Sequence, residues 1–203
     1  MTSSSPEPGW RDVAMFAARA ARLDPQTLIR VQPGPSDEAP SGGYVHLWSI
    51  LPLKVLAHRA AEVTIDSDAT FRSGDFGSEK KWPANRYDSQ WRAALPNSRG
   101  EVIETIPTHL IEEALQQATE ALEARRGGSV GDRRLRDALL DHETLHIQKG
   151  DLEYKVQLRL LIAAARMGFI GDDEVWVRLS GRRIGLEGTH GIIWQPDTAL
   201  RLL

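Results

Sequence analysis

The segment Val156–Phe169 (VQLRLLIAAARMGF) constrains the fold more than any other, because it is apolar on nearly every side. A helix of this kind is normally buried, and Gly168 near its end is a typical left-handed stop. Two short alternating runs, Glu174–Leu179 and Arg183–Glu187, follow it and are joined through Ser180–Arg182, a pattern that predicts a β-hairpin. We therefore predict a central buried helix that packs on this hairpin.

The composition narrows the classes of function. The chain has 203 residues and no cysteine, which excludes disulfides, cysteine-ligated zinc, iron–sulfur clusters and thiol catalysis. Its net charge of -3 and pI of about 6.1 give no global electrostatic reason to bind nucleic acid or an anionic membrane. No apolar run approaches the roughly 20 residues of a membrane span, and the N-terminus lacks the pattern of a secretory signal. We expect a soluble, cytoplasmic protein with no membrane association, and residues 1–8 to form a disordered tail.

The part from residue 9 to 100 is predicted to hold a helix and a small antiparallel sheet. Trp10–Leu23 carries apolar residues at helical spacing and predicts an amphipathic helix. Leu28–Val31 and Tyr44–Leu51 have strand patterns and are expected to pair with each other. Lys54–Ile65 fits either a helix or a strand, so its structure is left open.

Residues 66–90 form the most irregular stretch and are predicted to be a long loop, which in a compact domain is usually either disordered or functional. Trp82, Tyr87 and Trp91 lie in or beside it. These rings would anchor the loop to the core, as large aromatic side chains often do. The functional alternative is a stacking platform for a ligand.

The part from residue 101 to 203 is predicted to be largely helical and to end in the hairpin. Glu101–Ile106 has a strand pattern, a helix is expected from Thr108 to Ala124, and Asp132 is a candidate cap for another helix. The predicted fold class is α+β, with an N-terminal helix and small antiparallel sheet, and C-terminal helices packed on a β-hairpin.

Residues 142–146 (HETLH) match the H-E-x-x-H pattern of zinc-dependent hydrolases. In that pattern two histidines one helical turn apart bind zinc, and the glutamate between them activates the metal-bound water. On a helix, His142 and His146 would share a stripe with Leu135 and Leu139, and Glu143 would lie at its edge. The sequence therefore offers zinc ligands at His142 and His146 and a catalytic Glu143.

Other features of the same segment oppose a metal site. Thr144–Gln148 alternates like a strand and precedes the turn-like Lys149–Asp151; if it is a strand, the two imidazoles diverge. The favoured interpretation is that both histidines are structural or surface residues. No spacing specifies a third ligand, for which the candidates are Glu153, Glu174, Glu187 and His190.

The order of helices and hairpin in the C-terminal half is also similar to winged-helix modules. Arg178, Arg182 and Arg183 would lie on the wing. The candidate recognition helix offers only Arg159 and Arg166 for phosphates and is too apolar to lie exposed in a DNA groove. Nucleic-acid binding is therefore an alternative that the sequence does not favour.

Four short segments carry a resemblance to known sequences: Leu28–Val31, His46–Pro52, Leu135–Asp141 and Arg166–Phe169. In these segments the chain resembles a family of uncharacterised actinobacterial proteins. The resemblance implies no activity, because none is assigned to that family.

Taken with the motifs, these patterns favour a non-enzymatic binding or assembly module that acts with a protein partner or as a homo-oligomer, and no cofactor is expected. The first alternative is a zinc-dependent metallohydrolase that uses His142, Glu143 and His146. The second is a winged-helix-like nucleic-acid-binding protein.

Overall fold

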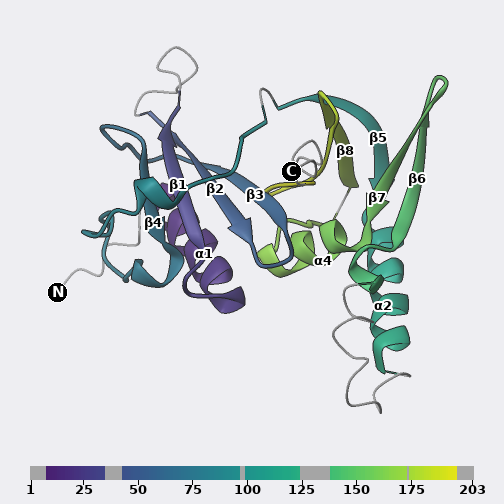
Figure 1. Cartoon of the computed structure of the whole chain (residues 1–203), viewed down its shortest axis with the longest axis horizontal. Coiled ribbons are helices and arrows are strands. Elements are labelled where there is room, and N and C mark those ends of the chain that lie inside the picture. The colour runs from purple at the N-terminus through teal and green to yellow at the C-terminus, as the bar shows by residue number, and fades with distance from the viewer. Residues whose placement is uncertain (1–7, 35–42, 97–98, 124–137, 173, 196–203) are drawn as a thin grey trace. The chain divides into compact units, whose positions relative to one another are not determined.

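The computed structural model describes residues 8–34, 43–96, 99–123, 138–172 and 174–195 (Figure 1). The chain divides into two compact units, Met1–Ala94 and Leu95–Leu203, which we call unit 1 and unit 2 and describe one at a time. The described elements have the α+β composition that the sequence predicts. None of the helices in these ranges is long and apolar enough to span a membrane.

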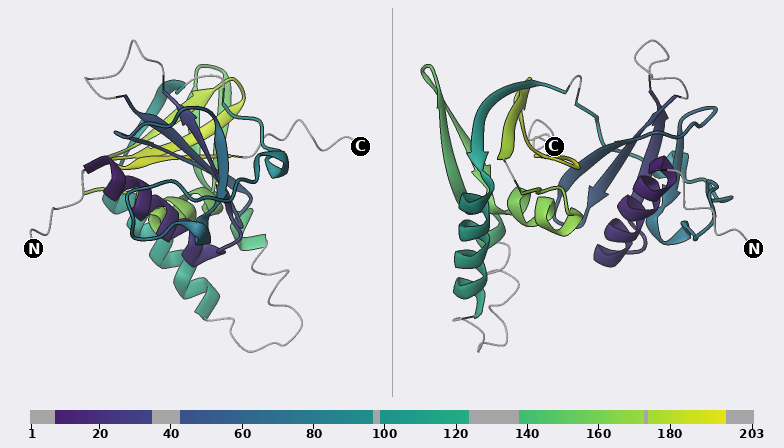
Figure 2. Two further views of the ribbon diagram at one scale, coloured as in Figure 1. Left: turned by 90° about the vertical axis from the view of Figure 1, so that its left-hand side faces the viewer. Right: turned by 180° about the vertical axis from the view of Figure 1, so that it is seen from behind.

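Unit 1 is an antiparallel sheet with one helix on a face. The helix and strands are α1 (Pro8–Leu23), β1 (Leu28–Pro33), β2 (Val45–Leu51), β3 (Val55–Ala61) and β4 (Ala69–Arg72). Their order within the unit is β4-β1-β2-β3, and Figure 2 shows α1 running along the sheet. Phe16 and Ala20 of α1 are buried with Ile29, Val31 and Leu47 of the strands. The predicted helix and the predicted pairing of the first two strands are confirmed.

Two expectations for unit 1 need correction, and one that the sequence left open is decided. Residues 66–90 are not one irregular loop, because they contain β4, which pairs with β1, and two short 3₁₀ turns. Lys54–Ile65, left open above, contains the strand β3. Pro8, placed in the tail, is the first residue of α1, and residues 1–7 lie outside the described ranges.

The aromatic residues of this stretch hold the loop on the core. The Trp82 ring stacks with Phe71 at a centroid distance of 5.9 Å and lies 4.8 Å from the Trp10 ring. Trp91 is buried and its Nε1 donates to a backbone carbonyl. Arg72 lies over the Tyr87 ring at 4.3 Å. These contacts support the anchoring interpretation.

Asp68 fixes the loop to the first strand by its carboxylate. It accepts hydrogen bonds from Arg30 at 2.6 Å and from Gln32 at 3.0 Å. Burial works to raise the pKa of Asp68, but these two hydrogen bonds and the Arg30 charge together outweigh it, so that its pKa lies below the ordinary 3.8.

The described residues of unit 2 form four antiparallel strands, a separate hairpin and two helices. The strands β10 (Gly191–Trp194), β9 (Arg183–Gly188), β8 (Glu174–Ser180) and β5 (Glu101–Pro107) lie in this order. The hairpin is β6 (Glu143–Lys149) with β7 (Leu152–Gln157), and it projects beside β5 (Figure 1). The helices are α2 (Thr108–Glu123) and α4 (Leu158–Met167).

The predicted helix-on-hairpin core is confirmed, with a shorter helix. α4 begins at Leu158 because Val156 and Gln157 end strand β7, and it ends at Gly168, whose φ of 59° is the left-handed stop. Leu160 and Leu161 are completely buried, and α4 contacts β9 and β10. The hairpin β8–β9 turns at Gly181, where φ is 61°.

The helix expected from Asp132 falls largely on residues 124–137, which lie outside the described ranges. Residues 138–140 are helical, and the chain turns at Asp141 before entering β6. The structure therefore ends any such helix before the histidine motif.

Candidate functional site

The histidine motif lies on a strand. Glu143 and His146 are in β6, and His142 directly precedes it. Residues four apart in a strand are separated by roughly 13 Å, whereas two zinc ligands must each lie about 2.1 Å from one ion. The helical turn that would bring His142 and His146 to a common ion is absent here.

Glu143 and His146 instead make cross-strand polar pairs on the exposed β6–β7 hairpin. His146 Nδ1 lies 2.7 Å from Glu153 Oε1, and this hydrogen bond lowers the pKa of Glu153. Glu143 lies 2.8 Å from Lys155 Nζ, and its hydrogen bond raises the pKa of Lys155. Such cross-strand pairs stabilise a hairpin modestly.

Of the four candidate third ligands, Glu153 lies beside one motif histidine, His146, and the other three lie elsewhere. Glu187 is buried and engaged by Arg99 and Arg178, while Glu174 begins β8 and His190 lies in an exposed turn. Among the described residues no three His, Asp or Glu side chains are placed to hold a metal ion. Zinc binding at His142 stays a prediction, and the geometry of β6 does not favour it.

Two arginines of the winged-helix alternative, Arg178 and Arg159, are held by carboxylates. Arg178 pairs with Glu187 and donates to the Gly100 carbonyl at 2.9 Å. Arg159 on α4 is buried and pairs with Asp141. The β6–β7 hairpin also precedes α4, where a winged helix would have a further helix.

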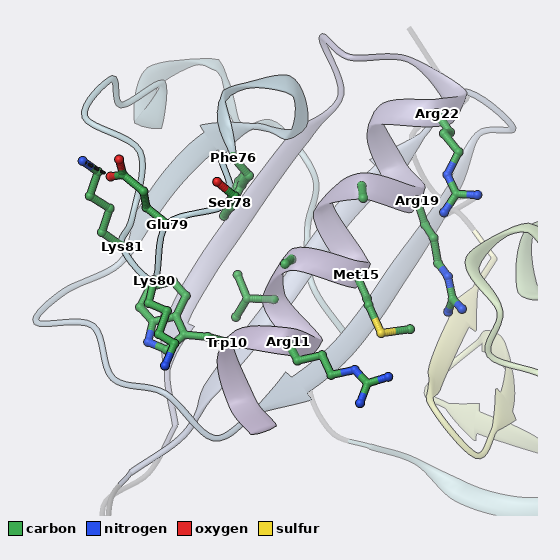
Figure 3. Close-up of a pocket in the computed structure, with 14 residues that line it drawn as sticks. Trp10, Arg11, Met15, Arg19, Arg22, Phe76, Ser78, Glu79, Lys80 and Lys81 are labelled. Carbon is green, nitrogen blue, oxygen red and sulfur yellow. Dashed lines mark ion pairs between the residues drawn. The ribbon is translucent and has the colours of Figure 1, made fainter. Parts of the chain in front are cut away.

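Unit 1 contains a concave site, a groove beside α1 (Figure 3). One wall is the solvent-facing side of α1, and the other is the loop Phe76–Lys81. The groove has a volume of about 380 Å³, which is within the lower range of ligand-binding pockets.

Apolar side chains line the groove between these walls. Trp10, Val13 and Met15 come from α1, and Phe76 comes from the loop. Trp82 holds both walls, because its ring lies 4.8 Å from the Trp10 ring and 6.4 Å from the Phe76 ring. Aromatic packing of Trp82 therefore supports both walls of the groove.

The rim of the groove is strongly basic. Figure 3 shows that its charged side chains come from both walls, and the cationic ones are Arg11, Arg19, Arg22, Lys80 and Lys81. The single carboxylate in the lining is Glu79, which pairs with Lys81. Asp12 lies on the same helix but pairs with Arg59 of β3 at 2.5 Å, away from the groove. The lining thus carries an excess of positive charge on a chain that is acidic overall.

The sequence analysis missed this site, although part of its signal was present. Arg11, Arg19 and Arg22 are eight and three residues apart, which at about 100° per residue places all three within one 80° sector of the helix. The contribution of Phe76 and Lys80 could not be predicted, because their position depends on a loop that the sequence does not fix.

The comparisons with known proteins identify domains without assigned function. A family model described as "Domain of unknown function (DUF8185)" matches residues 95–200, and a second, "Domain of unknown function (DUF8010)", matches residues 7–77. No curated protein matches the chain. These descriptions agree with the expected resemblance to an uncharacterised family.

One solved structure has a similar fold. It is the crystal structure of the DNA polymerase III beta subunit from Thermotoga maritima, with a TM-score of 0.50 and 13% sequence identity. The match covers 93% of this chain and 62% of that chain, so this protein spans less than two thirds of the beta subunit. At this identity the likeness concerns the fold alone.

Proposed function

We propose that this chain, which belongs to the DUF8185 family, is a non-enzymatic binding module whose groove on α1 docks a segment of a partner protein. The observation that carries the proposal is the combination of an apolar groove with a basic rim. The partner segment would present at least one large apolar side chain between acidic residues.

The size of the groove suits a short polypeptide segment. Arg11 and Arg22 mark its two ends on α1, and eleven residues of helix rise about 16 Å. An extended segment of about five residues covers that length. Ala14 and Ala18 are exposed between these ends, and their small side chains allow a partner to approach the helix closely.

The charge of the rim favours an acidic partner. Within the described residues no carboxylate pairs with Arg11, Arg22 or Lys80, so these cations remain available to a ligand. Charge complementarity contributes mainly to specificity and to the association rate, while the apolar contacts contribute most of the affinity. Since the groove is smaller than a standard protein interface, we expect transient binding.

The structural neighbour supports an assembly role. The Thermotoga maritima protein is by its description a subunit of DNA polymerase III, that is, one component of a larger assembly. A shared fold is compatible with a module that acts by contacting other proteins. The identity of the partner does not follow from the neighbour, and the groove chemistry defines only its class.

Peptide display against the purified full chain tests the proposal. We expect the selected peptides to be rich in Asp and Glu around an apolar residue, and to lose binding to the Ala18→Glu variant, which places a negative charge in the groove. Ala165→Glu is the matched control, because Ala165 is exposed on α4 in unit 2. Selected peptides without acidic bias, or equal binding to Ala18→Glu, would contradict the proposal. Binding of nucleic acid in place of acidic peptides would also contradict the proposal.

A further inference from the structure

A second cluster of chemically active side chains lies on the strands β2 and β3 of unit 1. Alternation along β2 directs Val45 and Leu47 into the core, where both are buried. His46 and Trp48 therefore lie on the opposite face of β2, where the antiparallel register sets Trp48 against His58 of β3. This face carries two imidazoles from neighbouring strands.

The two imidazoles are held close together by their neighbours. His46 Nδ1 and His58 Nε2 are 2.9 Å apart. The Trp48 ring stacks on His58 at a centroid distance of 4.0 Å and an interplanar angle of 26°. Tyr44 meets His46 edge-on at 5.1 Å. Both histidines are only partly buried.

We propose that His46 and His58 form a two-imidazole site for a divalent transition-metal ion, preferentially Cu²⁺. Imidazole nitrogens bind such ions at about 2.0–2.1 Å. Two ligands at 90° on a square-planar or tetragonal ion are then about 2.8–3.0 Å apart, whereas a tetrahedral angle requires about 3.3–3.4 Å. The observed 2.9 Å is an ordinary hydrogen-bond length, and it is close to the nitrogen separation of the first arrangement, so both rings would turn their lone pairs toward the ion with little change in that separation. Cu²⁺ prefers this arrangement.

Metal binding requires one proton to change its position. In the hydrogen bond one of the two facing nitrogens carries the hydrogen, while the ion needs the lone pairs of both. The donor ring therefore shifts its proton to its other nitrogen and stays neutral. No net proton is released from a neutral pair, and the His46–His58 hydrogen bond is exchanged for two metal–nitrogen bonds.

The protein supplies two ligands, and water completes the coordination. In the described ranges no third His, Asp or Glu joins a metal-holding group, and the chain has no cysteine. The site is thus open, like sites that exchange their ligands, rather than closed like a structural zinc site. Trp48, stacked on His58, would report occupancy because bound Cu²⁺ quenches indole fluorescence.

A Cu²⁺ titration of the full chain tests the proposal by tryptophan fluorescence and electron paramagnetic resonance. We expect one Cu²⁺ per chain with two equatorial nitrogen ligands, and quenching that is largely lost in Trp48→Phe. His46→Ala and His58→Ala should each weaken binding about 10–100-fold. His58→Gln, which can retain a hydrogen bond to His46, serves as a second variant in case His58→Ala unfolds.

The control variant is His142→Ala with His146→Ala, which removes the other histidine pair of the chain. We expect it to bind Cu²⁺ as the unsubstituted protein does. Binding that is unchanged in both His46→Ala and the His58 variants would overturn the proposal, as would loss of binding in the control variant alone. A resonance spectrum without nitrogen ligands would also contradict it.

Discussion

Glu187 provides the sharpest test of how unit 2 is stabilised. Its carboxylate side chain is 7% exposed and is engaged by two arginines. Arg178, 14% exposed, pairs with one carboxylate oxygen. Arg99, 70% exposed, reaches the other at 2.5 Å. The two pairs share one carboxylate but differ in solvent exposure, so their energies should differ as well.

The Glu187→Ala substitution leaves the guanidinium of Arg178 without its carboxylate in a poorly solvated place. Removing one partner of a buried pair costs about 3–5 kcal/mol. Arg99→Ala removes a solvent-exposed partner, which costs about 0–1 kcal/mol. We therefore expect Glu187→Ala to destabilise unit 2 severely and Arg99→Ala to have little effect.

Hydrogen exchange at the amides of β8 and β9 measures stability locally, at the strands that carry Arg178 and Glu187. A loss of 3 kcal/mol or more should accelerate exchange there by about a hundredfold or more. The paired substitution Arg178→Met with Glu187→Leu should recover most of the loss, because it removes both buried charges together. Equal effects of Glu187→Ala and Arg99→Ala would refute the reasoning.

Three further outcomes follow from the structure. Folding lowers the pKa of Asp68, so its ionised carboxylate stabilises the protein fully above the ordinary pKa of 3.8, and this stabilisation is lost as the pH falls through the lower folded value. Urea unfolding at pH 7 should therefore show that Asp68→Asn is less stable than the unsubstituted protein. The difference in stability should close in acid. Gly188→Ala would place a Cβ 2.1 Å from the Phe169 carbonyl oxygen, so thermal unfolding should show a loss above about 3 kcal/mol, at the severe end for single substitutions. Elemental analysis of the purified protein should find no stoichiometric zinc. Stoichiometric zinc that disappears in His142→Ala would revive the hydrolase alternative.

The predictions that succeeded depended on local patterns. α4 and the β8–β9 hairpin were predictable from local sequence alone. A helix that is apolar all round fits only a buried position, and two alternating strands around a glycine turn fit only a hairpin. β4 was missed because its four residues are defined by pairing with β1, far along the chain. Residues 142–146 suited a helix or a strand, and pairing with β7 determines the outcome.

The groove was only half predictable for the same reason. The arginines of α1 share one sector of a helix that the periodicity of Trp10–Leu23 predicts. The opposite wall exists because Trp82 packs between Trp10 and Phe76, a contact between distant segments. His46 and His58 likewise meet only through the register of β2 and β3. Sites assembled from several segments therefore need the tertiary structure.

The binding of a labelled acidic peptide tests the central claim most directly. The probe contains Leu and Glu, and a matched peptide has Lys in place of each Glu. Fluorescence anisotropy should show binding of the acidic peptide alone, weaker in Ala18→Glu than in Ala165→Glu. It should also weaken between about 0.01 M and about 1 M salt, as the Debye length falls from about 30 Å to about 3 Å. Equal binding of both peptides, or equal affinity for both variants, would contradict the account.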